Sequence, residues 1–467
     1  MGSARQPGTR ISRRRFLAGT GTGALAAGLA SRGTSSAAAE AEASQAGRSG
    51  TLRVAGIGVG GRGSTNLQAL AGTGAAVVAL CDCDERQAAE SFARHPEARR
   101  YTDWRRLLDA DRDLDAVLIS TPDHHHAAVA IAAMQRGLHV YCEKPLARTI
   151  WEAREMARVA SSSPHLVTQM GTQGHSYEGT RRAVEVLRGG TIGEVTELHV
   201  WTDRPAGWWP QGIARPRETP PVPDGLDWDV WLGPAPQRSY HTAYVPFTWR
   251  GFWDFGTGAI GDMGIHSLDT AFWGLGLGAP VSARVKECSP ALGAPRLKET
   301  APLWSIIELQ FPARGARPPV TMTWYDGGKL PPQDLFQGEP LISKDGGSLI
   351  VGTRGTLFTR TWHGGQTEQD MFVLLPRRAF ADVRPPAPRL PRTSGHHQEW
   401  VDACLGRRHA QSPFAYAAVL TEALLVGNLA LRTGAPIEWD FAAMRATNAP
   451  AADAFVKPEM RAGWGWS

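Results

Sequence analysis

Two different alternations of hydrophobic and polar positions follow each other along the chain. From residue 51, short apolar runs such as LRVAGIG and LDAVLIS are separated by helix-length amphipathic stretches such as ERQAAESFARH. Strands that alternate with helices of this length are joined by right-handed crossovers and lie parallel in one sheet. The pattern therefore predicts an α/β domain with a doubly wound parallel sheet over residues 50–170.

The pattern changes after residue 171, where longer strand-like runs follow one another without helices between them. VTELHVWTD, APLWSIIELQF and VTMTWYDGG are examples, and proline- and tryptophan-rich loops separate them. Consecutive strands of this kind form a largely antiparallel sheet. Two amphipathic stretches near the end predict helices. We therefore expect a second α/β domain over residues 171–445 and a C-terminal tail at 446–467.

The first 45 residues have the order of a signal peptide. A basic stretch precedes an apolar, small-residue run, and further small residues follow around 37–39. The run SRRRFL resembles the twin-arginine motif, which directs proteins to the twin-arginine export machinery already folded. We therefore predict a twin-arginine signal peptide and linker at 1–45 and an extracellular, periplasmic or cell-envelope location. A disordered basic tail is the alternative.

Charge, cysteine content and hydropathy argue against nucleic-acid binding, a disulfide or metal framework, and a membrane span. The formal net charge is +5, and most of it comes from the N-terminal arginines, so the remainder gives no electrostatic reason to expect nucleic-acid binding. The five cysteines form no C-x-x-C pair, so we predict neither a disulfide framework nor a metal site. No later run of about 18 apolar residues is present, so we predict no membrane span.

A glycine-rich turn follows the first predicted strand. Residues 58–63, GVGGRG, fit G-x-G-x-x-G between a strand and a helix, where glycine lets the backbone approach a pyrophosphate. Asp82 ends the second strand, at the place of a carboxylate that accepts from ribose hydroxyls and disfavours a 2′-phosphate. These features predict a dinucleotide site and favour NAD, while Arg86 leaves NADP open.

Two further turns lie at the carboxyl ends of predicted strands, where a doubly wound sheet binds its ligand. The Thr-Pro turn at 121–122 precedes three histidines, whose adjacent side chains do not converge as metal ligands do. We expect a helix N-terminal turn there, with His126 packed inward. The Glu-Lys-Pro run at 143–145 would place Lys144 over the nicotinamide end of the cofactor, where its charge favours a substrate alkoxide. A plain surface lysine is the alternative.

Asp262 and His266 are four residues apart in GDMGIHSLD, so they share one face if the segment is helical. A histidine with a near-neutral pKa can accept a hydroxyl proton while hydride leaves the same carbon, and a neighbouring carboxylate can orient the ring or contact the substrate. A helix-capping aspartate beside a core histidine would explain the same spacing. The spacing alone does not decide between the two interpretations.

Taken together, these motifs resemble a known family. GIGVGGRG, TPDHHH, CEKPLA and GDMGIHSLD, in this order and spacing, resemble the glucose–fructose oxidoreductase, inositol dehydrogenase and rhizopine-catabolism (Gfo/Idh/MocA) family over about residues 50–445. The resemblance implies an N-terminal Rossmann domain and a C-terminal α/β domain with a large, mostly antiparallel open sheet. It implies a homodimer or homotetramer, and sugars, cyclitols or their derivatives as substrates. By the same resemblance Lys144, Asp262 and His266 are the catalytic residues.

The motifs also give two sets of expected contacts. We expect NAD or NADP to be bound by Gly58, Gly60, Gly61, Arg62, Gly63, Asp82, Thr121, Pro122, His126, Glu143 and Lys144. We expect the substrate to contact Lys144, His175, Trp208, Trp209, Asp262 and His266. His175 stands where many family members carry a small or basic residue, which leaves that substrate contact open.

The aromatic residues support a sugar substrate. Seven of the 17 tryptophans lie within residues 201–253, and the loop WTDRPAGWWPQG is too polar and proline-rich to be a core strand. Tryptophan faces stack on the apolar side of pyranose rings, and polar residues of the same loop can bind hydroxyls. We expect Trp208 and Trp209 to line the substrate site and several other tryptophans to fill the core.

Export and a dinucleotide together constrain the function. An enzyme that releases reduced cofactor outside the cytoplasm lacks the partner reactions that reoxidise it. We therefore predict an exported NAD(P)-dependent oxidoreductase that acts on a sugar, cyclitol or glycoside hydroxyl by hydride transfer and recycles a tightly bound cofactor. One alternative is an NAD-dependent glycoside-cleaving enzyme that uses transient oxidation and elimination. The other is a non-catalytic sugar-binding protein on the same fold.

Overall fold

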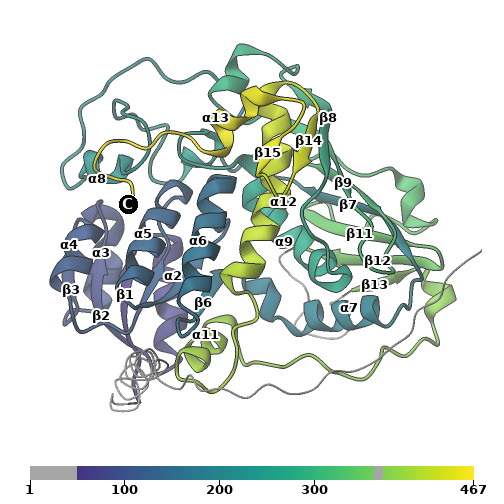
Figure 1. Cartoon of the computed structure of the whole chain (residues 1–467), viewed down its shortest axis with the longest axis horizontal. Helices are drawn as coiled ribbons and strands as arrows, with labels where there is room; N and C mark the ends of the chain where they lie inside the picture. Colours follow the sequence, from purple (N-terminus) through teal and green to yellow (C-terminus); the bar gives the residue numbers. More distant parts are fainter. Residues whose placement is uncertain (1–49, 362–371, 467) are drawn as a thin grey trace, which may run out of the picture. The chain divides into compact units, whose positions relative to one another are not determined.

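The structure is a computed structural model that describes residues 50–361 and 372–466. One compact unit extends from Thr51 to Ser467. It contains two sheets, which lie to the left and right in Figure 1 with helices between them. The predicted signal peptide at 1–45 lies outside the described residues.

The first sheet is a doubly wound sheet. Within the described residues it has six parallel strands in the order β3-β2-β1-β4-β5-β6. Its strands are β1 (Arg53–Ile57), β2 (Ala76–Cys81), β3 (Arg99–Tyr101), β4 (Ala116–Ile119), β5 (His139–Glu143) and β6 (Thr168–Gly171). Its helices are α2 (Arg62–Ala71), α3 (Glu85–Arg94), α4 (Trp104–Ala110), α5 (Asp123–Gln135) and α6 (Ile150–Ser162). The strand order reverses between β1 and β4, which is where such sheets bind ligands, and the predicted parallel sheet is confirmed.

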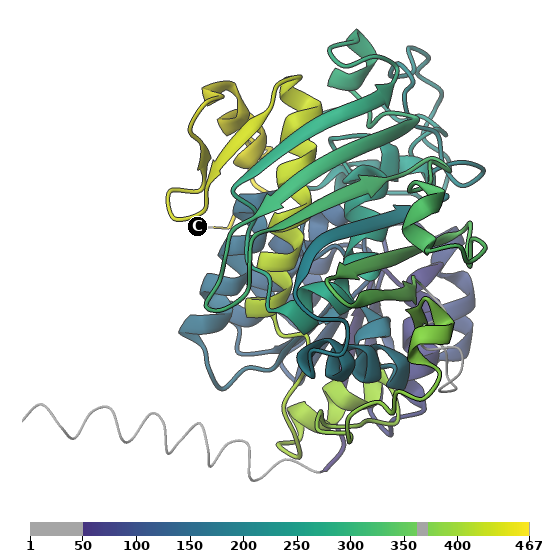
Figure 2. The ribbon, with the colours of Figure 1, turned by 90° about the vertical axis from the view of Figure 1, so that its right-hand side faces the viewer.

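The second sheet is mixed and mostly antiparallel, as predicted. In the part of the chain that the structure describes, nine strands follow the order β13-β12-β11-β7-β10-β9-β8-β14-β15, and only β7 and β10 pair in parallel. The strands are β7 (Val195–Thr202), β8 (Ser282–Ser289), β9 (Trp304–Phe311), β10 (Val320–Tyr325), β11 (Gly346–Gly352), β12 (Gly355–Arg360), β13 (Val373–Leu375), β14 (Ile437–Asp440) and β15 (Arg445–Ala446). The helices of this part are α7 (Glu178–Arg188), α8 (Trp228–Leu232), α9 (Gly258–Leu275), α11 (His396–Cys404), α12 (Phe414–Thr433) and α13 (Asp453–Val456). Figure 2 looks onto the strands, with helices of the core behind them.

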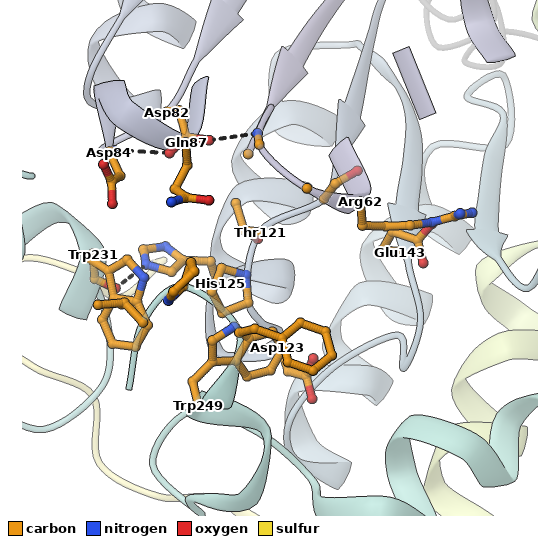
Figure 3. Close-up of a pocket in the computed structure, with 18 of the residues that line it drawn as sticks. Arg62, Asp82, Asp84, Gln87, Thr121, Asp123, His125, Glu143, Trp231 and Trp249 are labelled. Carbon is orange, nitrogen blue, oxygen red and sulfur yellow. Dashed lines mark hydrogen bonds and ion pairs between the residues drawn. The ribbon is translucent and has the colours of Figure 1, made fainter. Parts of the chain in front are cut away.

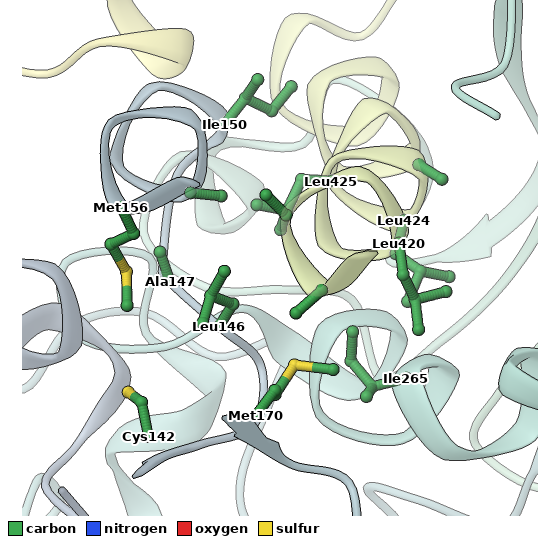
Figure 4. Packing of buried hydrophobic residues seen from close by; sticks show 14 of the residues in the cluster. Cys142, Leu146, Ala147, Ile150, Met156, Met170, Ile265, Leu420, Leu424 and Leu425 are labelled. Carbon is green, nitrogen blue, oxygen red and sulfur yellow. The ribbon is translucent and has the colours of Figure 1, made fainter. Parts of the chain in front are cut away.

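Helix α12 joins the two parts of the fold. It packs against α6 on one side and against α9 and β8 on the other, and Leu420, Leu424 and Leu425 enter the same cluster as Leu146 and Ile265 (Figure 4). Among the described residues, α12 is the one helix long and apolar enough to cross a membrane, and 83% of its apolar window is buried inside the structure. The burial of α12 in the core therefore explains why this helix is so hydrophobic.

The last described residues return to the first sheet. After β15 and α13, the ring of Trp464 lies under the Arg105 guanidinium at 3.6 Å, and Trp466 stacks on Trp151 with ring centroids 5.1 Å apart. Arg461 donates to the carbonyl of Gly233, just beyond α8. The segment expected as a tail thus packs on α4, α6 and the end of α8.

Candidate active site

A cavity of about 520 Å³ opens at the carboxyl ends of β1, β2, β4 and β5, the switch point of the first sheet. One side is formed by the turns that follow these strands, and the other by residues between 204 and 263. Figure 3 shows the two sides, with Asp82 and Thr121 on the first and Trp231 and Trp249 on the second. The cavity therefore combines the predicted nucleotide site with a tryptophan-rich wall.

The glycine turn fits a pyrophosphate. Gly58 has φ 76°, and a Cβ built on it would lie 2.7 Å from the backbone nitrogen of Thr121. Gly61 has φ 46° and precedes α2, where no side chain caps the helix, and a Cβ built on it would meet no atom within 4 Å. The helix start is thus left open toward an anion, as dinucleotide-binding turns require.

The carboxylate of Asp82 holds this turn in place through hydrogen bonds from its backbone. Its Oδ2 accepts from the backbone nitrogens of Val59 (2.8 Å) and Gly60 (3.1 Å), and its Oδ1 accepts from that of Asp84 (3.0 Å). Burial raises the pKa of Asp82, and the backbone donors act against that rise. The guanidinium of Arg86 is held by Asp84 through two hydrogen bonds, at 2.8 and 2.7 Å. Two carboxylates therefore stand at this end of the cavity.

All three histidines of the 124–126 run are buried, where His126 alone was expected to be. His124 and His125 each place Nε2 2.9 Å from the carbonyl oxygen of Trp231. His126 places Nδ1 2.9 Å from the Pro145 carbonyl and Nε2 2.9 Å from that of Thr121. Burial lowers the pKa of His126, so the ring is neutral and donates to one of these carbonyls at a time. His126 thus ties the two turns together.

Glu143 is a second organising carboxylate. Its Oε1 accepts from Arg62 Nε, Asn66 Nδ2 and Gln173 Nε2, each at 2.9 Å. Burial would raise the pKa of Glu143, but the charges of Arg62 and Lys144 outweigh it and lower the pKa to about 2. Glu143 therefore stays ionised and fixes the start of α2 against the end of β5.

Lys144 and Asp262 form a buried ion pair in the cavity. Lys144 Nζ donates to Asp262 Oδ1 at 2.8 Å and to its carbonyl oxygen at 3.1 Å, and both side chains are 11% exposed. Arg250 Nε lies 3.4 Å from the same carboxylate oxygen. Burial would raise the pKa of Asp262, but Lys144 and Arg250 lower it to about 2. The ammonium group is thus held in one position by a fixed negative charge.

His266 lies one helical turn after Asp262 in α9, so the predicted helical spacing is present. Its side chain is buried, and burial and the charge of Lys144 lower the pKa of His266 to about 3. The ring is therefore neutral at physiological pH. It does not line the cavity itself, although it interacts electrostatically with both Lys144 and Asp262.

Asp123 was missed by the sequence analysis. It is the first residue of α5 and lines the cavity, and its Oδ2 accepts from the Thr257 hydroxyl at 3.1 Å. Burial, followed by the negative charge of Asp262, raises the pKa of Asp123 to about 7. A signal was present, because this carboxylate directly follows the Thr121-Pro122 turn that was assigned to the site.

The tryptophan loop divides into an exposed and a buried residue. Trp208 is 49% exposed, and the Arg204 guanidinium lies 3.4 Å from its ring centroid. Trp209 is buried, and its Nε1 donates to Gln211 Oε1 at 2.8 Å. Both line the cavity. Only Trp208 offers a broad free surface to a ligand, and Trp201 is among the tryptophans that fill the core.

The structure brings most of the predicted site residues together. Those that line the cavity are Gly58, Gly60, Gly61, Arg62, Asp82, Thr121, Pro122, Glu143, Lys144, Trp208, Trp209 and Asp262. Gly63, His126, His175 and His266 do not line it. His175 lies in the core, where its Nδ1 is 2.9 Å from Asp269 Oδ2 and its ring stacks on Trp273 at 4.0 Å.

Within residues 50–361 and 372–466, no group of three or more His, Cys, Asp or Glu side chains is arranged to hold a metal ion.

The sequence matches two family models. Residues 52–170 match the model described as "Oxidoreductase family, NAD-binding Rossmann fold", and residues 206–291 match "Oxidoreductase family, C-terminal alpha/beta domain". The first match contains the glycine turn and Lys144, and the second contains Trp208 and Asp262.

Curated relatives match part of the chain. Inositol 2-dehydrogenase of Salmonella typhimurium is 31% identical over 152 residues, which are 32% of this chain and 45% of the relative. A glycosyl hydrolase family 109 protein of Solibacter usitatus is 31% identical over 200 residues, 40% of this chain and 44% of the relative. The chain thus spans less than half the length of the curated relatives it matches.

A solved structure shares the fold. Aldose-aldose oxidoreductase from Caulobacter crescentus superposes with a TM-score of 0.56 at 18% identity, over 83% of this chain and 100% of the other. At this level of identity the likeness concerns the arrangement of the two sheets.

Proposed function

We propose that the chain is a member of the Gfo/Idh/MocA oxidoreductase family, whose models match residues 52–170 and 206–291, and that it is an exported NAD(P)-dependent oxidoreductase acting on a hydroxyl of a sugar, cyclitol or glycoside. The observation that carries this proposal is the Lys144–Asp262 pair, which stands in one cavity with an open glycine turn and an exposed tryptophan. These features match hydroxyl activation, dinucleotide binding and sugar stacking respectively.

The residues of the cavity divide the chemistry between them. A bound nicotinamide supplies the hydride acceptor or donor for the reacting carbon. Lys144 places a positive charge where it lowers the pKa of the substrate hydroxyl and stabilises the alkoxide. Asp262 fixes that charge. The expectation of a near-neutral His266 is wrong, because burial and Lys144 lower its pKa to about 3 and the ring does not line the cavity, so we do not assign it the proton transfer.

We infer NAD rather than NADP as the cofactor. Asp82 and Asp84 place two carboxylates at the end of the cavity where the ribose of the adenosine is expected. Because Arg86 neutralises Asp84, the repulsion of a 2′-phosphate comes chiefly from Asp82. Arg86, the cation that would favour NADP, is already paired with Asp84.

Export and retention of the cofactor belong to the same proposal. The SRRRFL motif supports transport of a folded protein, and such a protein can carry its dinucleotide with it. Replacing Arg13 and Arg14 together by lysine should leave the protein in the cytoplasm. Unchanged export of this double variant would exclude the twin-arginine route.

Glycoside cleavage is the second candidate, favoured by the similarity to a glycosyl hydrolase family 109 protein over 200 residues. In that reaction a ring hydroxyl is oxidised to a ketone, which acidifies the neighbouring C–H. The alcohol is eliminated, water adds across the resulting double bond, and the ketone is reduced again by the hydride taken in the first step. The same Lys144–Asp262 pair would serve it. A sugar-binding protein without turnover is the remaining alternative.

One experiment separates these functions. The purified mature protein is denatured, and the released nucleotide is identified and quantified. Stoichiometric NAD supports an enzyme, whereas a protein without nucleotide and without affinity for NAD or NADP contradicts both enzymatic proposals. Incubation with glycosides then divides them, because a free aglycone indicates cleavage and a keto-sugar indicates net oxidation.

A further inference from the structure

A second, smaller cavity lies where the starts of α6 and α9 meet α12 and α13. Its volume is about 20 Å³, which is room for an ion of the size of chloride or for water. Arg148 and Arg432 line it together with Thr257, Asn428 and Phe455. It is separate from the large cavity, with which it shares no lining residue.

Two guanidinium groups border this small space with little compensating negative charge. The side chain of Arg148 is 7% exposed; its Nη1 donates to the Trp253 carbonyl at 3.1 Å, and its Nη2 is 3.7 Å from Glu152 Oε1. Its Nε is buried without a hydrogen-bond partner. The Glu152 carboxylate also accepts from the backbone nitrogen of Thr149 in the capping box of α6. Its negative charge is therefore shared between Arg148 and the start of this helix.

Arg432 is less compensated than Arg148. Its guanidinium lies 4.0 Å from the ring centroid of Phe455 and 5.5 Å from that of Trp253, and it makes no hydrogen bond or ion pair with any described residue. Burial, followed by the charge of Arg148, lowers the pKa of Arg432 to about 9. The side chain of Arg432 is only partly buried, and the charge of Asp254 opposes the shift. The buried Arg148 Nε is therefore the atom that gains most from an anion.

The helix that starts at this cavity adds to the positive potential. Helix α9 has 18 residues, and its first turn has no side-chain cap at Thr257, so its N-terminal amides favour an anion. Asn428 Nδ2 donates to the Thr257 carbonyl at 2.9 Å, while Asn428 Oδ1 is buried without a donor. A water molecule that hydrates a bound ion would supply that donor.

We infer that this cavity binds a small monovalent inorganic anion such as chloride, held by Arg148 Nε and the Arg432 guanidinium at the start of α9. The site is coupled to the large cavity through Thr257, whose carbonyl faces Asn428 and whose hydroxyl donates to Asp123. Anion binding therefore steadies the helix that carries Asp262 and His266.

Thermal unfolding of the mature protein, without the predicted signal peptide, tests this inference. Chloride is titrated at constant ionic strength against gluconate, which is too large to enter. We expect a saturable rise in Tm of about 2 °C or more, lost in R432Q and kept in R158Q, which removes an exposed arginine of α6. A Tm that does not respond to chloride, or an equal response in R432Q, would overturn the inference.

Crystals grown in bromide give a second measurement that needs no variant. An anomalous scattering peak within hydrogen-bonding distance of Arg148 Nε would support the site. A peak-free cavity that holds only water would overturn it.

Discussion

The two sides of the large cavity are built in different ways. The nucleotide side is made by backbone: Gly58 and Gly61 have positive φ, and Asp82 holds the turn through backbone amides. The opposite wall is made by side chains such as Trp208, from a loop, and Arg250, from a short 3-10 helix (Thr248–Gly251), both between β7 and α9. The first side suits a ligand common to a whole family, and the second suits a ligand that differs among its members.

This difference predicts that the two sides can be disabled separately. Nucleotide retention should depend on the turn and survive changes in the wall. Turnover should depend on both. The predictions below test this separation in order of decreasing expected effect.

Replacing Lys144 by Ala should give the largest effect. The substitution removes the cation beside the reacting hydroxyl, so kcat should fall on the order of 10³-fold while bound nucleotide stays stoichiometric. Steady-state kinetics and nucleotide analysis of the same preparation measure both. K286A, on the half-exposed strand β8, is the control and should keep wild-type values. Loss of nucleotide along with activity would break the separation.

Replacing Gly61 by Ala should weaken nucleotide binding itself, although Gly61 lies on the same side of the cavity as Lys144. The new Cβ would enter the open space at the start of α2 and obstruct the pyrophosphate, so nucleotide affinity should weaken on the order of 100-fold. G74A is a matched control, because Gly74 also has positive φ and an open Cβ position but lies outside the cavity. Calorimetric titration with NAD measures the affinity. Equal losses in both variants would show that backbone strain, rather than obstruction, is the cause.

The sequence predicts the backbone-built side better than the wall. A glycine pattern after a strand encodes a turn within a few residues, and strand ends bring Asp82, Thr121 and Lys144 to one edge without any knowledge of distant contacts. The wall depends on how residues 204–250 fold, and their positions follow from packing over long sequence distances. Trp208 was found there only because its loop is too polar for the core.

Two histidine predictions show the same limit. His175 was expected near the substrate. It contacts Asp269 and Trp273 of α9 instead, almost a hundred positions later in the chain, and no local sequence pattern indicates these contacts. In the TPDHHH run, His126 was expected at the site, but Asp123 and His125 line the cavity and His126 does not. Local sequence indicates where a turn lies; which of its side chains points inward depends on what packs against it.

Asp123 sits where the two sides meet, and replacing it by Asn should change the pH dependence of stability. Burial raises the pKa of Asp123 to about 7, above that of an unfolded aspartate near 4. Below about pH 4 both states are protonated. As pH rises toward 7 the unfolded state releases its proton first, so wild type loses stability relative to D123N, on the order of 2–4 kcal/mol, and the difference is constant above pH 7.

Urea unfolding between pH 4 and 8.5 measures this difference. D382N, which removes an exposed carboxylate, should leave the pH dependence of wild type as it is. Parallel stability profiles for D123N and wild type would contradict the raised pKa, because they would show that Asp123 has the same pKa in the folded and unfolded states.

The smallest effect is expected for Trp208→Ala in the wall. The ring is 49% exposed and has Arg204 on one face, so its other face can stack on a sugar, a contact worth about 0.5–1.5 kcal/mol. KM should therefore rise a few-fold to about tenfold, with kcat nearly constant and nucleotide content unchanged. F441A is a matched control, because Phe441 is 45% exposed and carries Arg154 at 4.2 Å, but lies outside the cavity. A KM that rises equally in both variants would indicate general destabilisation. A drop in kcat without a change in KM would move Trp208 from the substrate wall to the positioning of Lys144 and Asp262.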